Sequence, residues 1–123
     1  MSARDAARAL ALGRLAIGAG LLAAPGPIGR VWIGEDAERA GAQIFARAVG
    51  VRELILGALT LHVLDRPGVG YRTVATCALA DAVDCAATLA VRERLPTFAA
   101  IGAIGLAGGG ALAGIGVAIA LRD

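Results

Sequence analysis

Residues 40–64, AGAQIFARAVGVRELILGALTLHVL, form an apolar stretch of membrane-spanning length that nevertheless carries Arg47, Arg52 and Glu53. About 20 mostly apolar residues cross the hydrocarbon core of a bilayer as a helix. A charge near the centre of a bilayer costs about 2.5–3.5 kcal/mol on insertion scales, so such residues usually face the bundle interior and pair there. The stretch therefore predicts a membrane helix that belongs to a bundle with a charged interior.

Three more apolar stretches flank this one, and proline-rich turns separate them. Pro25-Gly26-Pro27 ends the first, Asp65-Arg66-Pro67-Gly68 separates the second from the third, and Pro96 precedes the fourth, where Thr97 is the expected helix cap. We predict an all-α fold, a single membrane domain over residues 1–123, folded as an up-down-up-down bundle of four transmembrane helices. The expected spans are about 6–24, 40–64, 71–91 and 97–121.

Composition favours a membrane protein and excludes several other classes. The chain is 58% hydrophobic with a mean hydropathy of +0.73, and 18 of its 123 residues are glycine. Four spans leave no room for a soluble catalytic domain. All basic residues are arginines spread over every loop, and only four residues are aromatic, which argues against nucleic-acid binding. The first 24 residues resemble a secretory signal, but the charge of Arg14 within the apolar run favours a retained first span.

Six ionisable residues lie in the interior of the expected spans, at least about seven residues from either end, and their formal charges sum to zero. With a rise of 1.5 Å per residue, most of them lie near mid-helix, with Arg47 closer to the start of its span. In antiparallel spans, Glu53 is expected level with Asp84, and Arg14 level with about Gly50. Arg47 and Arg52 point away from the face of Glu53, so their long stems would have to bend to join one centre. The set forms the predicted ligand-binding site or charge network: Arg14, Arg47, Arg52, Glu53, Asp81 and Asp84.

One polar stripe follows the third span, where side chains recur at helical spacing at Cys77, Asp81, Asp84, Cys85 and Thr88. This stripe is expected to face inward. Two interpretations stay open: a buried salt-bridge network that fixes helix register and partner choice, or surplus carboxylates that titrate or bind a cationic or polar ligand.

No cofactor, metal site or catalytic residue is expected. A metal site could be drawn from His62, Cys77, Asp81 and Asp84, but His62 lies several turns from the others. The two cysteines are too far apart on one helix for a disulfide. There is no nucleophile elbow or phosphate loop. General acid–base chemistry on a lipid is the least supported hypothesis.

Two features concern partners and orientation. Residues 28–39 contain the only tryptophan, Trp32, and predict either an interfacial segment or a lid over a pocket within the bundle. Gly105-xxx-Gly109 and Gly110-xxx-Gly114 in the fourth span predict close packing against another span or a second copy, so a homo-oligomer stays open. Five arginines on the side of the termini against four on the other favour, weakly, cytoplasmic termini in the inner (plasma) membrane.

A family resemblance covers nearly the whole chain. Gly13-Arg14-Leu15, residues 47–54 (RAVGVREL) with Gly57, and residues 80–84 (ADAVD) resemble a family of small four-helix bacterial integral membrane proteins classed as a domain of unknown function. The most specific piece is Arg-x-x-Gly-x-Arg-Glu-Leu, paired with Asp-x-x-Asp on the next helix. The resemblance implies the four-span topology and the charged centre, but no activity.

A comparison with small multidrug transporters is weaker. They also have four short helices and a membrane-embedded glutamate, but their essential acid lies in the first helix, where this chain has Arg14, and their pocket is rich in aromatic residues. Proton-coupled drug export is therefore not expected.

Two functions are considered. The first, which is the one the sequence predicts, is a non-catalytic bundle, held by its charge network, that associates with itself or with a larger membrane complex. The second is a small carrier or lipophilic-ligand-binding protein that uses Glu53, Asp81 and Asp84. The expected partners are the lipid bilayer and, for the second function, a lipophilic small molecule.

Overall fold

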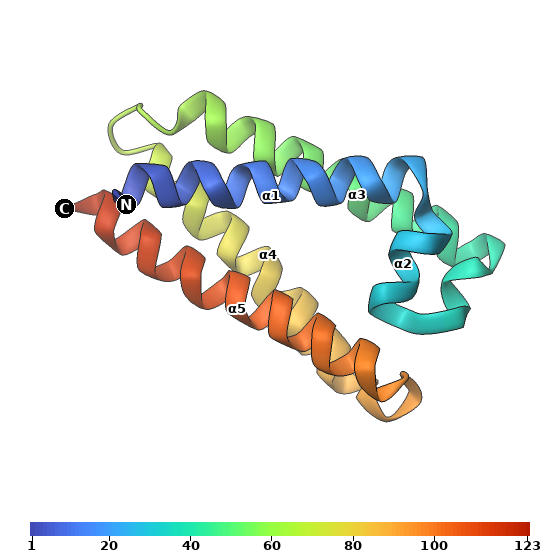
Figure 1. Cartoon of the computed structure of the whole chain (residues 1–123). Coiled ribbons are helices and arrows are strands. Elements are labelled where there is room, and N and C mark those ends of the chain that lie inside the picture. The colour runs from blue at the N-terminus through green and yellow to red at the C-terminus, as the bar shows by residue number, and fades with distance from the viewer.

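The computed structural model describes residues 1–123, and all of its regular elements are helices (Figure 1). The prediction of an all-α fold is confirmed. Its long helices begin and end within three residues of the expected spans, although whether each crosses a membrane is a separate question. The elements are α1 (Ala3–Ala23), α2 (Pro25–Ile33), η1 (Gly34–Glu38), α3 (Ala40–Val63), α4 (Gly70–Ala90), η2 (Arg92–Arg94) and α5 (Thr97–Arg122).

Local sequence signals account for most of the helix ends. Ser2 caps α1 in a capping box, in which its hydroxyl accepts a hydrogen bond from the Asp5 amide at 3.1 Å and its own amide donates to the Asp5 carboxylate. Gly68 takes a positive φ of 75° in the turn after α3. The expected capping role of Thr97 is wrong, because Pro96 occupies the cap position and Thr97 is the first residue of α5.

The helices associate as two antiparallel pairs, α1 with α3 and α4 with α5. Glycines let the first pair approach closely: a Cβ at Gly18 would lie 2.6 Å from the Gly50 carbonyl oxygen, and a Cβ at Gly57 would lie 2.8 Å from that of Ala11. The register places Gly18 beside Gly50, so the expectation that Arg14 lies level with Gly50 is wrong by about one turn. The connection between α1 and α3 is itself helical and consists of α2 and η1.

Only part of the expected glycine packing surface on α5 contacts another helix. A Cβ at Gly114 would lie 2.9 Å from the Ala78 Cβ of α4, and one at Gly110 would meet Asp81. Gly105 and Gly109 have nothing within 4 Å of a built Cβ. Gly110-xxx-Gly114 therefore packs α5 on α4, whereas Gly105-xxx-Gly109 lies on an open face of the helix.

The two pairs diverge from the end that holds both termini, and α2 lies at the open end (Figure 1). At the closed end, small and branched side chains form the core cluster of Ala7, Leu64, Val74 and Ala118. At the open end, α2 packs mainly on η1 and α5. Gly34 takes a positive φ of 71° in the turn between α2 and η1. A Cβ there would lie 2.6 Å from Pro96, which directly precedes α5. The segment expected as an interfacial stretch or a lid is thus an ordered helix in the opening between the pairs.

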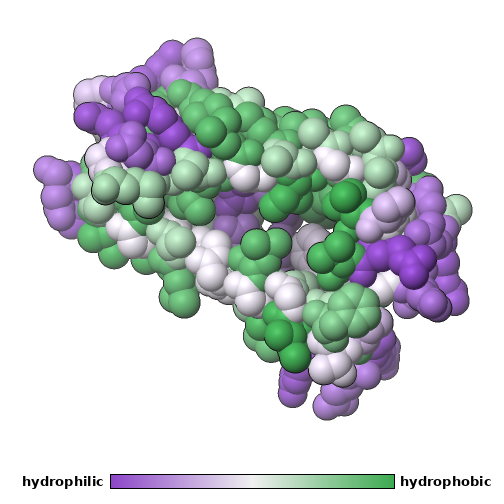
Figure 2. Space-filling model, viewed as in Figure 1, coloured by the Kyte–Doolittle hydropathy of each residue, from purple (hydrophilic) through white to green (hydrophobic).

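Three helices, α1, α4 and α5, are long and apolar enough to cross a membrane. Every 18-residue stretch of α3 contains Arg47, Arg52 and Glu53, and this charge content separates it from the other three. Hydrophilic residues gather at the two ends of the molecule, and hydrophobic residues cover much of the surface between them (Figure 2). Large apolar side chains point outward, among them Phe45, Phe98 and Leu112. This surface is that of a membrane protein.

Candidate functional site

Arg14 of α1 joins α3 to α4 through one guanidinium group. Its Nη1 donates to Oε2 of Glu53 at 2.8 Å, and its Nη2 donates to Oδ2 of Asp81 at 2.5 Å and to the Cys77 carbonyl oxygen at 3.2 Å. The side chains of Arg14, Glu53 and Asp81 are only 11%, 7% and 15% exposed. Because the fork of arginine fixes two acceptors at once, Arg14 determines how the two helix pairs meet at this depth.

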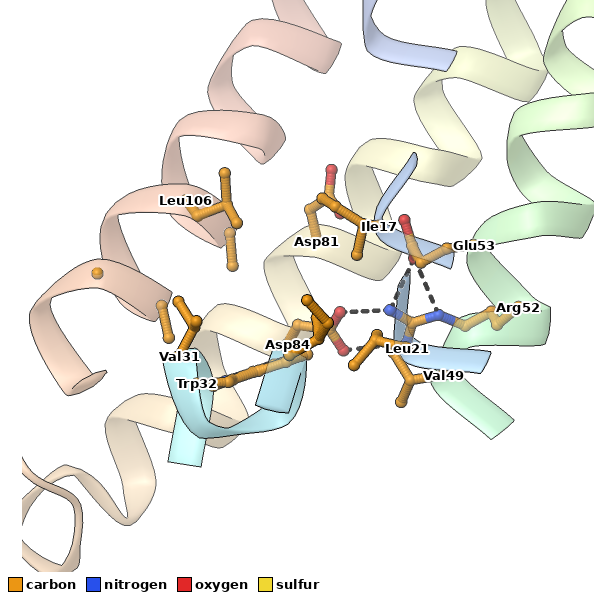
Figure 3. A pocket seen from close by; sticks show the side chains of 14 residues that line it. Ile17, Leu21, Val31, Trp32, Val49, Arg52, Glu53, Asp81, Asp84 and Leu106 are labelled. Carbon is orange, nitrogen blue, oxygen red and sulfur yellow. Dashed lines mark hydrogen bonds and ion pairs between the residues drawn. The ribbon is translucent and has the colours of Figure 1, made fainter. Parts of the chain in front are cut away.

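Arg52 makes the second bridge between α3 and α4. It donates to both oxygens of Asp84, at 3.0 and 2.5 Å, and to Oε1 of Glu53, at 3.0 Å from its Nη2 (Figure 3). Glu53 thus lies between the two arginines and accepts from both. The five side chains Arg14, Arg52, Glu53, Asp81 and Asp84 form one continuous hydrogen-bonded group, which we call the charge network.

Arg47 is the one predicted site residue outside the charge network. Its side chain is exposed and donates to the Leu22 carbonyl oxygen at 3.3 Å, on the side of α3 that faces α1. The expectation that Arg47 belongs to the site is therefore corrected, and the reason is the one that helical geometry suggested, since Arg47 points away from the Glu53 face. Arg52 points away as well, but its stem bends far enough to reach Glu53 and Asp84.

Because Arg47 lies outside the charge network, the formal charge of the network differs from that of the six predicted residues. Two arginines face three carboxylates, so the formal net charge of the network is −1 instead of zero. The carboxylates of Glu53, Asp81 and Asp84 each have an oxygen within 4.8 Å of the others. Like charges at this separation repel unless cations or protons offset them. One unit of negative charge at the centre has no arginine partner.

A cavity of about 220 Å³ adjoins the charge network, between the two helix pairs. Arg52, Glu53, Asp81 and Asp84 form its polar side. The rest of the wall is apolar and comes from α1, α2, α3 and α5: Ile17, Leu21, Ile28, Val31, Trp32, Val49, Gly102, Ala103, Leu106 and Ala107. In Figure 3, Trp32 and Val31 of α2 and Leu106 of α5 lie across the cavity from Arg52. In Figure 2 the surface is hollowed between the pairs, with hydrophilic residues visible at depth. Convergent polar groups in an apolar cavity are typical of ligand sites.

Trp32 ties α2 to the far helix pair and closes one side of the cavity. Its indole Nε1 donates to the Thr88 hydroxyl of α4 at 3.0 Å. The Thr88 hydroxyl in turn donates to the Asp84 carbonyl oxygen, one turn earlier, at 2.7 Å. Sequence reasoning placed Thr88 on the inward stripe of α4 but did not pair it with Trp32. The sequence does not indicate that Thr88 is the hydrogen-bond partner of Trp32, because tertiary structure sets this contact.

The residues considered for a metal site do not come together. His62 is exposed and contacts Arg66 at 3.0 Å, and Cys77 is buried against Thr60, with its Sγ 3.6 Å from that hydroxyl. The carboxylates that do converge, Glu53, Asp81 and Asp84, already accept from the two arginines. Ca²⁺ or Mg²⁺ takes six or more oxygen ligands and would compete with both guanidinium groups for these carboxylates.

The chain was also compared with known proteins. No protein-family model, no curated protein and no solved structure matches it. The resemblance to small four-helix bacterial membrane proteins therefore stays a prediction, and function has to be argued from the site.

Proposed function

We propose that the chain is a multi-pass protein of the inner (plasma) membrane in which α3 crosses together with α1, α4 and α5. Support comes from the neighbours of α3: it packs along α1 over most of its length, and its Arg52 and Glu53 are paired inside the bundle. Pairing removes much of the cost of burying these charges. Arg47 lies nearer the start of α3, where a long side chain can reach the interface. The excess of arginines at the end with both termini favours that end as cytoplasmic.

Within this bundle, we propose that the cavity binds a lipophilic small molecule, so that the protein is a small carrier or ligand-binding protein. One observation carries this proposal: the charge network forms a wall of an apolar cavity. A network that served only to lock the helices together would be expected to lie in close-packed surroundings, because voids in a protein interior destabilise it. The carboxylates are the polar groups that would orient the ligand.

A second candidate function is association with another copy or a larger membrane complex. It is favoured by the open face of α5, where Gly102, Gly105, Gly109 and Gly116 have nothing within 4 Å of a built Cβ. Small residues on a lipid-facing surface allow a second helix to approach closely. The matched test is the oligomeric state in nanodiscs of Gly109→Leu on α5 against Gly13→Leu on α1, since a Cβ at either exposed glycine has nothing within 4 Å. A monomeric wild-type protein would remove this candidate.

The ligand-binding proposal is tested by native mass spectrometry of protein extracted gently from its own membrane. Ala107→Leu adds a branched side chain at the cavity wall, and Ala113→Leu makes the same change at an exposed position of the same helix. We expect the wild type and Ala113→Leu to retain a bound small molecule or lipid that Ala107→Leu lacks. Equal bound mass in the two variants, or none in the wild type at any extraction condition, would contradict the proposal.

A further inference from the structure

The hydrogen bonds of the charge network reveal which carboxylate oxygen has no donor from the protein. Both oxygens of Asp84 accept from Arg52, and the two oxygens of Glu53 accept from Arg52 and Arg14 respectively. In Asp81, Oδ2 accepts from Arg14, whereas Oδ1 accepts no hydrogen bond from the protein. No buried side-chain oxygen in the structure lacks a partner, so Asp81 Oδ1 is accessible rather than enclosed. Asp81 lines the cavity, so the carboxylate with unused acceptor capacity belongs to its wall.

The walls of the cavity that α1, α2 and α5 form carry no positive charge to offset the net charge of −1 of the charge network. The residues that α1, α2 and α5 contribute to the wall are all uncharged. Arg30, on α2, is half exposed and pairs with Glu38 at 3.7 Å. Electrostatic attraction is stronger in apolar surroundings, because their effective dielectric constant is lower than that of water. The cavity is thus complementary to a single positive charge.

The size and opening of the cavity constrain the rest of the ligand. Its volume of about 220 Å³ is below the range of about 300–1,000 Å³ that holds a drug-sized molecule, but exceeds the 150 Å³ that encloses benzene. Several residues of its wall are themselves exposed, with Val31 66% and Leu106 67% exposed, and Ile17 and Ile28 about 40%. These residues mark an apolar mouth beside the middle of α1 and α5. A small head group fits inside, while an attached chain would leave through the mouth into the bilayer.

We propose that the cavity binds a protonated alkylamine, with the ammonium group at Asp81 Oδ1 and the alkyl chain leaving between α1 and α5. An ammonium group supplies both the missing positive charge and a hydrogen-bond donor for the free oxygen. The indole of Trp32 on the opposite wall provides an aromatic surface that also favours a cation. A divalent metal ion suits the site less well, because only one carboxylate oxygen has no partner. This inference rests on the proposed ligand-binding function and specifies its ligand class.

The test compares dodecylamine with 1-dodecanol, which has the same chain and no charge, in nanodiscs of phosphatidylcholine. Trp32 is the only tryptophan and lines the cavity, so its fluorescence reports occupancy. We expect saturable binding of dodecylamine at least tenfold tighter than that of dodecanol. Asp81→Asn, which makes the network neutral, should remove the difference. Arg47→Gln, which removes a charge outside the network, should leave it unchanged.

Two other outcomes separate the inference from the proposed function. If both compounds bind equally to the wild type and Ala107→Leu abolishes both, the cavity binds ligands and the preference for a cation is overturned. If neither compound gives a saturable signal that Ala107→Leu alters, ligand binding at this cavity is overturned as well. The comparison within the wild type decides the charge preference even if Asp81→Asn fails to fold.

Discussion

Replacing Arg14 by glutamine removes the group that holds Glu53 of α3 and Asp81 of α4 together. The glutamine keeps much of the side-chain volume and can still donate a hydrogen bond, but it carries no charge. Glu53 and Asp81 would then face each other with only Arg52 nearby, and the network would carry a formal charge of −2. The variant therefore isolates the contribution of the positive charge of Arg14.

The expected loss in free energy of unfolding follows from the contacts of Arg14. It makes two charge-assisted hydrogen bonds with partners that are at most 15% exposed. Hydrogen bonds to charged groups contribute about 1.5–3 kcal/mol each. Breaking a buried ion pair by removing one partner costs about 3–5 kcal/mol. We expect a loss of about 3 kcal/mol, at the lower end of both ranges, or roughly two orders of magnitude in the folding equilibrium.

Equilibrium unfolding in mixed micelles of dodecyl maltoside and sodium dodecyl sulfate, followed by circular dichroism, measures this loss. Arg47→Gln is the matched control, because Arg47 is exposed and bonded only to a backbone carbonyl; we expect its effect to lie within about 0.5 kcal/mol. The double variant Arg14→Gln with Asp81→Asn restores a charge of −1 and should be more stable than Arg14→Gln alone. Equal losses for Arg14→Gln and Arg47→Gln would refute the role assigned to the network.

Three further substitutions test the packing around the site. Trp32→Phe removes the hydrogen bond between α2 and α4, and should lower the free energy of unfolding by about 1 kcal/mol in the same assay; an unchanged value would contradict the closing role of α2. Gly18→Val places its Cβ 2.6 Å from the Gly50 carbonyl oxygen, so α1 and α3 must move apart. We expect the free energy of unfolding to fall by about 1–3 kcal/mol, and an unchanged value would disprove the close approach of the two helices. Gly114→Val places its Cβ 2.9 Å from the Ala78 Cβ of α4 and should destabilise the protein by a similar amount. Gly116→Val is the control, because its Cβ has no atom of a neighbouring helix within 4 Å, and it should have no such effect. Equal effects would show that α5 packs on α4 through another surface.

The sequence predicts the long helices well because strong local signals mark their ends. Proline and glycine separate the apolar stretches, and each stretch has the length of a membrane span. It also predicts most of the charge network, since a fixed rise per residue sets the depth of a side chain along its helix. Glu53 and Asp84 do share a depth, and Arg52 joins them.

The remaining features depend on tertiary geometry that local patterns do not encode. Arg47 and Arg52 both lie on α3 away from the face of Glu53. Arg52 joins the charge network and Arg47 does not, because only the stem of Arg52 bends far enough to reach it. The nine-residue helix α2 has two prolines at its start and no long apolar repeat to indicate it. The cavity arises because the two helix pairs diverge, and their divergence is set by contacts between segments far apart in the sequence.

The sequence does contain a signal for the first helix pair. Gly50, Glu53, Gly57 and Thr60 follow one another at helical spacing, and all four are buried. The glycines between α1 and α3 make the closer contacts, because there backbone meets backbone.

The membrane depth of the charge network is tested most directly by a nitroxide spin label on α3. Ile55 is 59% exposed and lies two residues from Glu53, so a label at Ile55→Cys, in a protein with Cys77 and Cys85 replaced, reports the surroundings of the network from outside the bundle. In liposomes, we expect dissolved oxygen to relax the label strongly and a water-soluble nickel chelate to leave it almost unaffected, as at the centre of a bilayer. Strong relaxation by the nickel chelate would show that α3 lies in water, which would contradict both the four-span arrangement and an intramembrane binding site.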